Sequence, residues 1–145
     1  MNLTLFTDFA LRALMRLAGE PTRSFATNEI AAEFGISRNH LAKVVRDLAE
    51  GGFIHTQRGA GGGFRLARQP QAITLGEVVR ALEARHALVE CFRDDGGNCV
   101  LLARCRLRGR LAAAREAFIR ELDTTTLAEC AYPARARRNT APSAS

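Results

Sequence analysis

The sequence predicts a mainly α-helical protein with a small β wing, in which a winged helix-turn-helix domain precedes a long C-terminal dimerisation helix. Three observations support this fold class. Two helical patterns between residues 27 and 50 flank a three-residue turn that begins at Gly35. Two short strand patterns with a glycine-rich loop follow directly. One apolar stripe at helical spacing then runs from residue 101 to about residue 123.

Composition limits the classes of function. The 145 residues are enough for one domain with a modest core and one appended element. A net charge of +6 and a pI near 10.1 favour an acidic partner, with nucleic acid the first candidate. No apolar run approaches the length of about 20 residues that spans a membrane, and the N-terminus lacks the features of a signal peptide. We therefore expect a cytoplasmic protein whose thiols stay reduced.

The first helical pattern starts near Leu5 and stops before Pro21. Its apolar positions, from Leu5 to Leu17, are expected to face the core. Asp8 lies on the opposite side of this helix from Leu5 and Phe9. Taken alone, Asp8 is therefore a solvated first-turn carboxylate that the helix dipole favours.

The helix-turn-helix pattern follows, with Thr27 and Ser37 as the expected N-caps of its two helices. The second helix leaves polar side chains facing outward at its N-terminal end, where recognition helices contact base edges. Six Lys or Arg residues and two acidic residues lie between Gly35 and Pro70. This stretch therefore carries a net charge of +4, out of +6 for the whole chain. The predicted DNA contacts are Thr27, Ser37, Arg38, Asn39, His40, Lys43 and Arg46, together with Arg58 and Arg65 from the wing.

The wing is predicted from strands at residues 53–57 and 64–67, joined by the loop Arg58–Gly63. Glycine lets the loop approach a DNA backbone or a narrow minor groove, where arginine is favoured. A nucleotide-binding loop is not supported, because no Lys-Ser/Thr pair and no helix follow the glycines. A winged helix that binds protein in place of DNA is the alternative.

Three of the four cysteines, Cys91, Cys99 and Cys105, lie within 15 residues around a polar loop. Clustered cysteines in a reducing compartment indicate metal binding or redox sensing. Zinc sites usually show two close cysteine pairs, which are missing here, whereas iron–sulfur clusters tolerate wider spacing. Local sequence leaves several candidates for a fourth ligand: Cys130, His86, Asp94, Asp95 and Asp8.

The last helical pattern carries an apolar stripe that needs a cover. The N-terminal module could cover part of it, but a second copy of the same helix is the more natural cover and gives a symmetric homodimer. The stripe consists of Leu107, Leu111, Ala114, Phe118 and Leu122.

The chain is therefore expected to have four parts. Residues 1–82 form the winged helix-turn-helix DNA-binding domain, and residues 83–100 form the cysteine-containing cluster-binding loop. Residues 101–130 form the dimerisation helix with a short C-terminal segment. Residues 131–145 form a disordered basic tail.

Several runs resemble one known family over about residues 1–130. They are the opening run 3–14, the helix-turn-helix run 30–44, the wing run 59–67, and the short runs 89–92 and 125–128. They resemble the iron–sulfur winged-helix regulators that include IscR, and within them the nitric-oxide-sensing NsrR-type repressors. The spacing of seven residues between the first two cysteines is longer than is usual there.

The resemblance implies one iron–sulfur cluster per subunit, 4Fe–4S with 2Fe–2S as the other form, held by Cys91, Cys99 and Cys105. Asp8 matches an aspartate that NsrR-like proteins donate as fourth ligand from the other subunit. IscR-like members carry a histidine where this chain has Arg108. The resemblance thus implies a homodimeric repressor that leaves a palindromic DNA operator when nitric oxide nitrosylates its cluster.

Two other functions stay open, and one class is not supported. A regulator of the same kind could respond to cluster status, iron or redox stress. A zinc- or thiol-based structural module could use its winged helix to bind protein. No Ser/His/Asp set, pair of catalytic carboxylates or nucleotide loop supports an enzyme.

Overall fold

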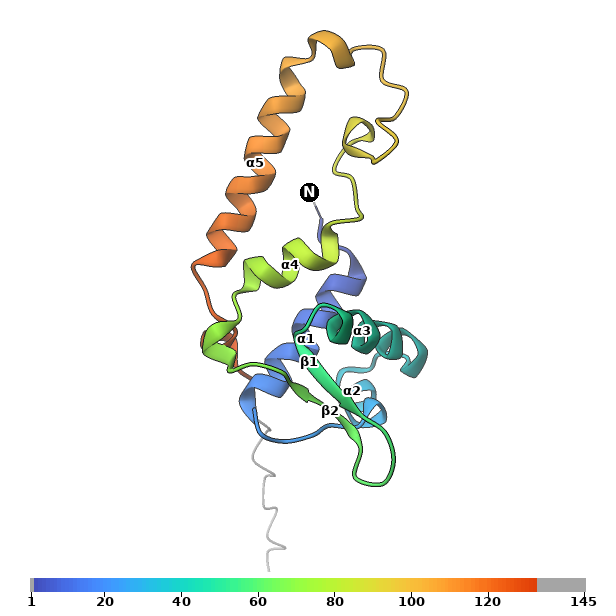
Figure 1. Ribbon diagram of the computed structural model, residues 1–145, viewed down its shortest axis with the longest axis vertical. Coiled ribbons are helices and arrows are strands. Elements are labelled where there is room, and N and C mark those ends of the chain that lie inside the picture. The colour runs from blue at the N-terminus through green and yellow to red at the C-terminus, as the bar shows by residue number, and fades with distance from the viewer. Residues whose placement is uncertain (1, 133–145) are drawn as a thin grey trace, which may run out of the picture.

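The structure is a computed structural model that describes residues 2–132. Its helices are α1 (Leu5–Gly19), α2 (Thr27–Phe34), α3 (Arg38–Glu50), α4 (Leu75–Glu83) and α5 (Arg106–Asp123), and its strands are β1 (Ile54–Gln57) and β2 (Gly63–Leu66). Short 3-10 turns lie at Pro70–Ala72, Glu90–Phe92, Leu102–Arg104 and Leu127–Cys130. The first three helices and the β-hairpin form one end of the molecule, and the cysteine segment with the start of α5 forms the other (Figure 1).

The wing is an antiparallel hairpin in which Ile54 lies opposite Leu66. Phe25, between α1 and α2, forms a bridge with Phe64, and each backbone N–H donates to the other's carbonyl at 2.9 Å. Gly63 permits this approach, because a Cβ there would lie 2.4 Å from the carbonyl oxygen of Phe25. Backbone hydrogen bonds as well as apolar side chains therefore fasten the wing to the domain.

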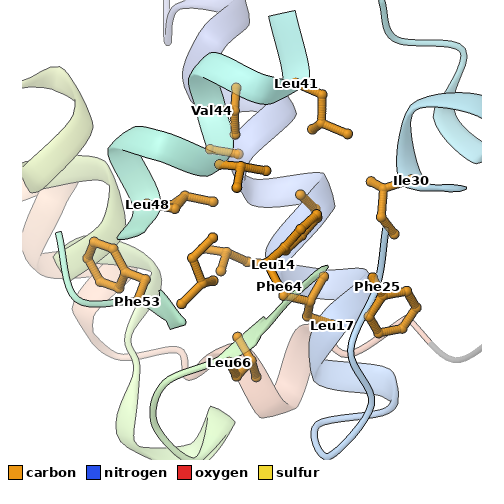
Figure 2. Close-up of a cluster of buried hydrophobic side chains, with 14 of the residues drawn as sticks. Leu14, Leu17, Phe25, Ile30, Leu41, Val44, Leu48, Phe53, Phe64 and Leu66 are labelled. Carbon is orange, nitrogen blue, oxygen red and sulfur yellow. The ribbon is translucent and has the colours of Figure 1, made fainter. Parts of the chain in front are cut away.

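The apolar core lies between α1, α2, α3 and the hairpin (Figure 2). Leu14 and Leu17 from α1 meet Phe53 and Phe64 from the wing, and all four are at most 2% exposed. The predicted inner face of α3 is confirmed, since the following residues are buried: Leu41, Val44, Val45 and Leu48. Because α1 contacts α3, α4 and the turn after α5, this helix joins the helix-turn-helix to the C-terminal elements of the chain.

The first turn of α1 differs from the prediction. The sequence pattern places Leu5 in the core, but Leu5 is 63% exposed, and Phe6 and Phe9 are only partly buried. The turn lies at the edge of the domain, beside the end of α4, so Phe6 and Phe9 only pack against the core from outside, and the fully buried apolar positions begin at Ala10.

Of the two predicted helix caps, the one at Ser37 is confirmed, because its hydroxyl accepts the His40 N–H at the start of α3. The hydroxyl of Thr74 caps α4 in the same way. The cap assigned to Thr27 is wrong, because Ala26 is the N-cap residue and Thr27 is already the first residue of α2. The bridge at Phe25 holds the preceding backbone extended, which starts the helix one residue earlier than the pattern of capping side chains indicates.

The helix α5 begins at Arg106, and the prediction that it begins at residue 101 is wrong. A 3-10 turn and an extended Cys105 occupy the residues before it. Within the described residues, Ile119 is the fully buried position of α5, whereas Leu107 and Phe118 of the stripe are 62% and 37% exposed. The stripe is thus largely uncovered in a single chain. Among residues 2–132 no helix has the length and apolarity to span a membrane.

The C-terminal end of α5 is fixed to the start of α4. Thr74 Oγ1 donates to Asp123 Oδ1 at 3.1 Å, and Arg80 Nη2 donates to Asp123 Oδ2 at 3.0 Å. The hydrogen bond from Arg80, followed by that from Thr74, holds the pKa of Asp123 below its ordinary value. Gly76 lies against this junction, where a Cβ would be 2.6 Å from the carbonyl oxygen of Ile119. The two helices therefore meet with almost no side chain between them.

After α5 the chain returns along the domain. The Leu127 N–H donates to the carbonyl of Ile73, and the Tyr132 N–H donates to the carbonyl of Met15, both at 2.8 Å. The tail predicted to start at residue 131 therefore does not include Tyr132. The rest of that predicted tail, residues 133–145, lies outside the described residues.

Candidate nucleic-acid interface and cysteine segment

The N-terminal end of α3 is the candidate DNA-reading surface. Ser37 caps the helix by accepting the His40 N–H at 3.2 Å. The buried inner face of α3 turns its polar residues outward, and all of the predicted contacts on this helix are exposed: Ser37, Arg38, Asn39, His40, Lys43 and Arg46. Contact with DNA itself stays a prediction.

These residue types suit the chemistry of the major groove. Arginine can donate two hydrogen bonds to guanine, and asparagine can pair with adenine. The uncapped N–H groups of a helix start favour a phosphate. Arg46 is less available than Arg38, because its Nε lies 3.4 Å from Asp47 Oδ1. Arg38, Asn39 and Lys43 are therefore the strongest candidates for base or phosphate contacts.

The wing supplies the second basic surface. Arg58 and Arg65 are exposed, and the loop between the strands bends at Gly59 and Gly61, which have φ of 97° and 74°. Figure 1 shows this loop at the opposite end of the long axis from the cysteine segment. Thr27, half-buried in the first turn of α2, is the least accessible of the predicted DNA contacts.

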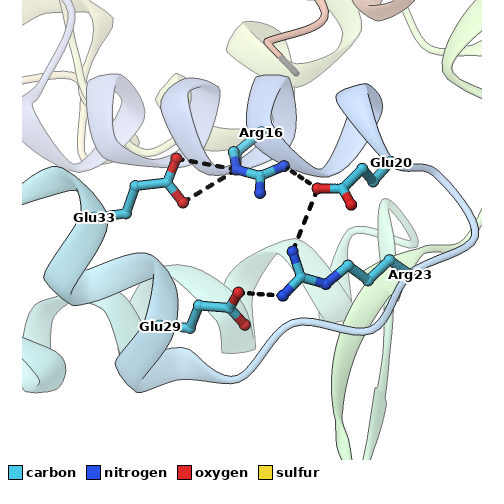
Figure 3. Close-up of polar contacts among 5 residues, drawn as sticks. All are labelled: Arg16, Glu20, Arg23, Glu29 and Glu33. Carbon is cyan, nitrogen blue, oxygen red and sulfur yellow. Dashed lines mark hydrogen bonds and ion pairs between the residues drawn. The ribbon is translucent and has the colours of Figure 1, made fainter. Parts of the chain in front are cut away.

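An ion-pair network around the buried Arg16 fixes the helix-turn-helix to α1 (Figure 3). Arg16 is 3% exposed, and its guanidinium donates to Glu20 at 2.7 Å and to Glu33 of α2 at 3.0 Å. Arg23 joins the network through Glu20 and Glu29. This is a structural cluster that reasoning from the sequence missed, although a charged residue inside the apolar pattern of α1 was a signal for it.

The ion pairs of this network keep its side chains charged, and its two arginines lie over the ring of Phe25. Burial alone would lower the pKa of Arg16, but its hydrogen bonds to Glu20 and Glu33 outweigh burial and raise it. The same contact with Arg16 lowers the pKa of Glu20. The guanidinium carbons of Arg16 and Arg23 lie 4.7 and 4.3 Å from the ring centroid of Phe25. Cation–π attraction therefore adds to the ion pairs.

A second cluster that the sequence did not reveal joins the end of α4 to the start of α1. Glu83 Oε1 accepts from the Thr4 N–H at 2.9 Å, from Thr4 Oγ1 at 2.8 Å and from Thr7 Oγ1 at 2.5 Å. Burial alone would raise the pKa of Glu83, but the hydrogen bonds from Thr7 and Thr4 outweigh it and lower that pKa. The carboxylate therefore stays charged at the N-terminus of α1, where the helix dipole favours it.

The three clustered cysteines lie on the segment between α4 and α5. Cys91 is in the turn Glu90–Phe92, Cys99 follows the polar loop, and Cys105 immediately precedes α5. All three are half-buried and have free thiols. Among residues 2–132, no three His, Cys, Asp or Glu side chains are grouped so that they could hold a metal ion. A single chain thus presents the thiols without gathering them.

Hydrogen bonds shape the polar loop between Cys91 and Cys99. Glu90 Oε1 accepts the Asn98 N–H at 2.9 Å, and Asp95 accepts from Arg93 at 2.7 Å and from the Gly97 N–H at 3.0 Å. Gly97 packs so closely on Glu90 that a Cβ would lie 2.8 Å from the Glu90 carbonyl oxygen. The loop therefore turns back on itself, as its glycines predict.

The structure narrows the choice of fourth ligand within one chain. Cys105 and Cys130 lie beyond opposite ends of α5, an 18-residue helix with a length of about 27 Å. Cys130 therefore cannot join a site at Cys105 of the same chain. Asp95 already accepts hydrogen bonds from its own loop, and the Nδ1 of His86 lies 3.7 Å from Glu83 Oε2. Asp94 is exposed and is not excluded.

Asp8 is available to a second chain. Its carboxylate is 41% exposed and accepts two hydrogen bonds from Arg12, at 3.1 and 2.7 Å. An exposed i,i+4 pair of this kind contributes only about 0.3–0.5 kcal/mol. Breaking it is therefore a small cost beside forming a bond to a metal centre, so the expectation for Asp8 stays open as a prediction.

The donor chemistry fits an iron–sulfur cluster. Three free thiols within 15 residues supply the ligands that such clusters take. Side-chain hydrogen bonds order the segment that carries them, and none of the three sulfurs is in a disulfide. A preformed metal site rarely exists in an unfolded segment, so metal binding and the ordering of its ligands are coupled.

Comparisons with known proteins point to one family. A family model described as "Rrf2: Iron-dependent Transcriptional regulator" matches residues 3–132. The regulator "HTH-type transcriptional regulator NsrR" of Geobacillus kaustophilus is 49% identical over 131 residues, which cover 89% of this chain and 88% of that protein. The regulator of the same name from Halalkalibacterium halodurans is 41% identical over 128 residues, 88% of each chain.

Solved structures agree on the fold. CymR, the global cysteine regulator of B. subtilis, superposes with a TM-score of 0.68 at 29% identity, covering 90% of this chain and 96% of its own. IscR of T. potens superposes with a TM-score of 0.69 at 22% identity, covering 89% of this chain and 85% of its own. The mainly helical fold with a winged helix-turn-helix and a long C-terminal helix is thereby confirmed.

Proposed function

This chain belongs to the Rrf2 family of transcriptional regulators, and we propose that it is a DNA-binding repressor that senses nitric oxide through an iron–sulfur cluster. That it regulates transcription and is not an enzyme follows from the family. The observation that carries the sensing proposal is the placement of three free thiols on the segment that joins the DNA-binding domain to α5. The relatives named NsrR support the same interpretation.

DNA recognition is assigned to α3 and the wing within the domain of residues 1–82. Arg38 and Asn39 are proposed to contact base edges, and Lys43 a phosphate. Arg58 and Arg65 are proposed to contact the backbone or minor groove from the wing. Ser37, at the start of a helix, suits a phosphate next to its free N–H groups. Thr27, His40 and Arg46 complete the proposed interface.

The cluster is assigned to Cys91, Cys99 and Cys105, with the segment 83–100 forming most of its surroundings. When bound, a 4Fe–4S or 2Fe–2S cluster would supply the site that reacts with nitric oxide. The residues of the chain hold the thiols on a loop that is ordered by Glu90 and Asp95. If the bonds between the cluster and the three thiolates were broken, this loop would be free to take the conformation seen in the single chain.

A homodimer is proposed through α5 and Asp8. The exposed stripe residues Leu107 and Phe118 need a cover, and a second α5 presents the same stripe. Asp8 of one chain is proposed to leave Arg12 and to ligate the cluster of the partner. The bond would connect α1 of each subunit to the cysteine segment of the other, and so set the distance between the two recognition helices.

The first prediction concerns DNA binding. We expect Arg38→Ala to weaken binding of an operator, selected from random duplexes, by about 1–3 kcal/mol and to relax specificity at one base pair. Lys43→Ala is expected to weaken binding to all DNA sequences alike. It should also reduce, by about 1, the slope of the logarithm of the affinity against the logarithm of the salt concentration. Fluorescence anisotropy across a salt series measures both. Arg120→Ala, an exposed basic change on α5, is the control, and equal losses in all three variants would refute the assigned interface.

The second prediction concerns the cluster. Native mass spectrometry of protein purified without oxygen is expected to show a dimer with the added mass of two clusters, lost or converted to nitrosyl adducts on titration with nitric oxide. Cys99→Ser is expected to load no cluster. Asp8→Ala is expected to load the cluster through the three thiols, but to lose most of the difference in operator affinity between the loaded and cluster-free dimers.

Three outcomes would overturn parts of this proposal. A metal-free or zinc-loaded dimer that ignores nitric oxide would refute the sensor and leave the DNA-binding domain unaffected. Faster cluster loss with oxygen, peroxide or iron depletion than with nitric oxide would favour a regulator of cluster status or redox stress. An Asp8→Ala variant with unchanged cluster-dependent DNA binding would refute the ligand from the partner chain.

A further inference from the structure

We propose that Glu83 is the positioning residue that couples the cysteine segment to α1, an inference that rests on the proposed function. Glu83 is the last residue of α4, so the segment with the three cysteines leaves the domain directly after it. Its carboxylate reaches across to the first turn of α1, where it binds Thr4 and Thr7. One side chain therefore touches both parts of the molecule that the sensing mechanism must connect.

The contact is strong because Glu83 and Thr7 are largely shielded from water, whereas Thr4 is partly exposed. Glu83 has a 12% exposed side chain, and Thr7 is fully buried. A single oxygen, Oε1, accepts the three hydrogen bonds, and charge-assisted bonds of this kind are about twice as strong as neutral ones. Removing the charge would leave the Thr7 hydroxyl with a weaker partner in a buried position.

The other carboxylate oxygen faces the cysteine segment. Glu83 Oε2 lies 3.7 Å from Nδ1 of His86, three residues into that segment. Beside them is a hollow of about 450 Å³ between the start of α1, the end of α4 and α5. Leu3, Leu88 and Phe118 are among the residues that line it. The segment after Glu83 is therefore not packed tightly against the start of α1 on this side, and the Glu83 carboxylate, which lines the hollow, contacts both of them.

The helix α1, which Glu83 contacts, carries Asp8, the proposed ligand of the partner's cluster, and also packs against the recognition helix α3. Asp8 follows Thr7 directly, and its N–H donates to the Thr4 carbonyl at 3.0 Å, so the Glu83 carboxylate holds the turn that presents Asp8. Further along α1, Leu14 and Leu17 belong to the core shared with α3. A change in the cysteine segment would thus reach the recognition helix of its own chain through Glu83, and the partner's cluster through Asp8.

The test compares Glu83→Gln with Glu77→Gln, a control on an exposed ion pair of the same helix. In cluster-free protein, amide hydrogen exchange at residues 7–9 is expected to rise about 10-fold in Glu83→Gln and to stay unchanged in the control. The reverse measurement uses Thr7→Val, which is expected to raise exchange at residues 84–90 on the other side of the carboxylate. Thr56→Val, an exposed change in β1, is its control.

The functional readout is the ratio of operator affinities of the cluster-loaded and cluster-free dimers. A merely structural Glu83 would lower stability and leave this ratio unchanged, whereas a coupling residue is expected to reduce it at least about fivefold. An unchanged ratio, or exchange that stays at wild-type rates in both segments, would overturn the proposal. A wild-type dimer whose DNA affinity ignores the cluster would instead refute the proposed function. The exchange measurements need no cluster and would still decide whether Glu83 connects the two segments.

Discussion

We expect Gly76→Ala to loosen α5 from the winged-helix domain. A methyl group at residue 76 would lie 2.2 Å from Asp123 Oδ1 and 2.6 Å from the carbonyl oxygen of Ile119. The Asp123 side chain can turn away, though it would then lose its bonds to Thr74 and Arg80. The Ile119 carbonyl belongs to the α5 backbone and cannot move alone, so the whole helix must shift.

Two opposing effects decide the size of this loss. Alanine favours a helix over glycine by about 1 kcal/mol, which would stabilise α4. Overpacking a close contact costs about 1–3 kcal/mol and occasionally more. Because one clash is with backbone, we expect the upper part of that range and a net loss of stability. Denaturant unfolding of the protein measures it as a lower midpoint.

Gly109→Ala is the matched control, because Gly109 lies on α5 and a Cβ added there would meet no atom within 4 Å. That variant is expected to gain about 0.5–1 kcal/mol from helix propensity alone. Equal effects at the two glycines, or a gain of stability in Gly76→Ala, would contradict the close α4–α5 junction. If the proposed dimer forms, cluster loading should be normal in Gly76→Ala, but operator affinity should be lower, because α5 would no longer hold the two DNA-binding domains at one distance.

We expect Arg16→Met to be the most damaging change in the polar groups of the domain. Methionine replaces the apolar stem but removes the charge that binds Glu20 and Glu33. Breaking a buried ion pair costs about 3–5 kcal/mol, and the exposure of the two carboxylates, 37% and 33%, reduces the expected loss to about 2–3 kcal/mol. The α2 helix would lose its polar connection to α1, so DNA affinity should fall with stability.

Arg12→Met is the control for Arg16→Met. It removes an arginine from the same helix and an i,i+4 ion pair with Asp8, but its side chain is 48% exposed. An exposed pair is worth about 0.3–0.5 kcal/mol, so the two variants should differ several-fold in their effect on the free energy of unfolding. Similar losses would show that the network around Arg16 is no more than a set of surface charges.

Much of the fold could be predicted because its signals are local. The inner face of α3 follows from the spacing of Leu41, Val44 and Leu48, and the start of the helix from Ser37. The glycines of the wing loop predict its turn. The three cysteines could be singled out from spacing alone. Whether they hold a cluster, and whether Asp8 joins them, depends on a second chain and on a metal, which no local pattern contains.

The predictions that failed concern residues whose surroundings come from elsewhere in the chain. Thr27 has the right side chain for a cap, but the N-cap lies at Ala26, next to the bridge between Phe25 and Phe64, and Thr27 is already inside the helix. Leu5 continues the apolar pattern of α1, but no other element of the described residues covers it at the edge of the domain. In both cases the side chain suits the predicted role, but the residue lies at a place in the fold where that role is not available.

By itself, the sequence determined the winged helix-turn-helix, the basic recognition surface and the cysteine segment. Helical periodicity, caps, turns and residue chemistry act over a few neighbouring positions, so they can be recognised without the rest of the chain. Only the tertiary structure decided that Arg16 binds Glu33, that Glu83 holds the start of α1 and that Gly76 lies against α5. The first two contacts join residues 17 and 76 positions apart in the sequence, and the third brings the backbones of two helices together. The energy of such a contact depends on how the whole chain packs.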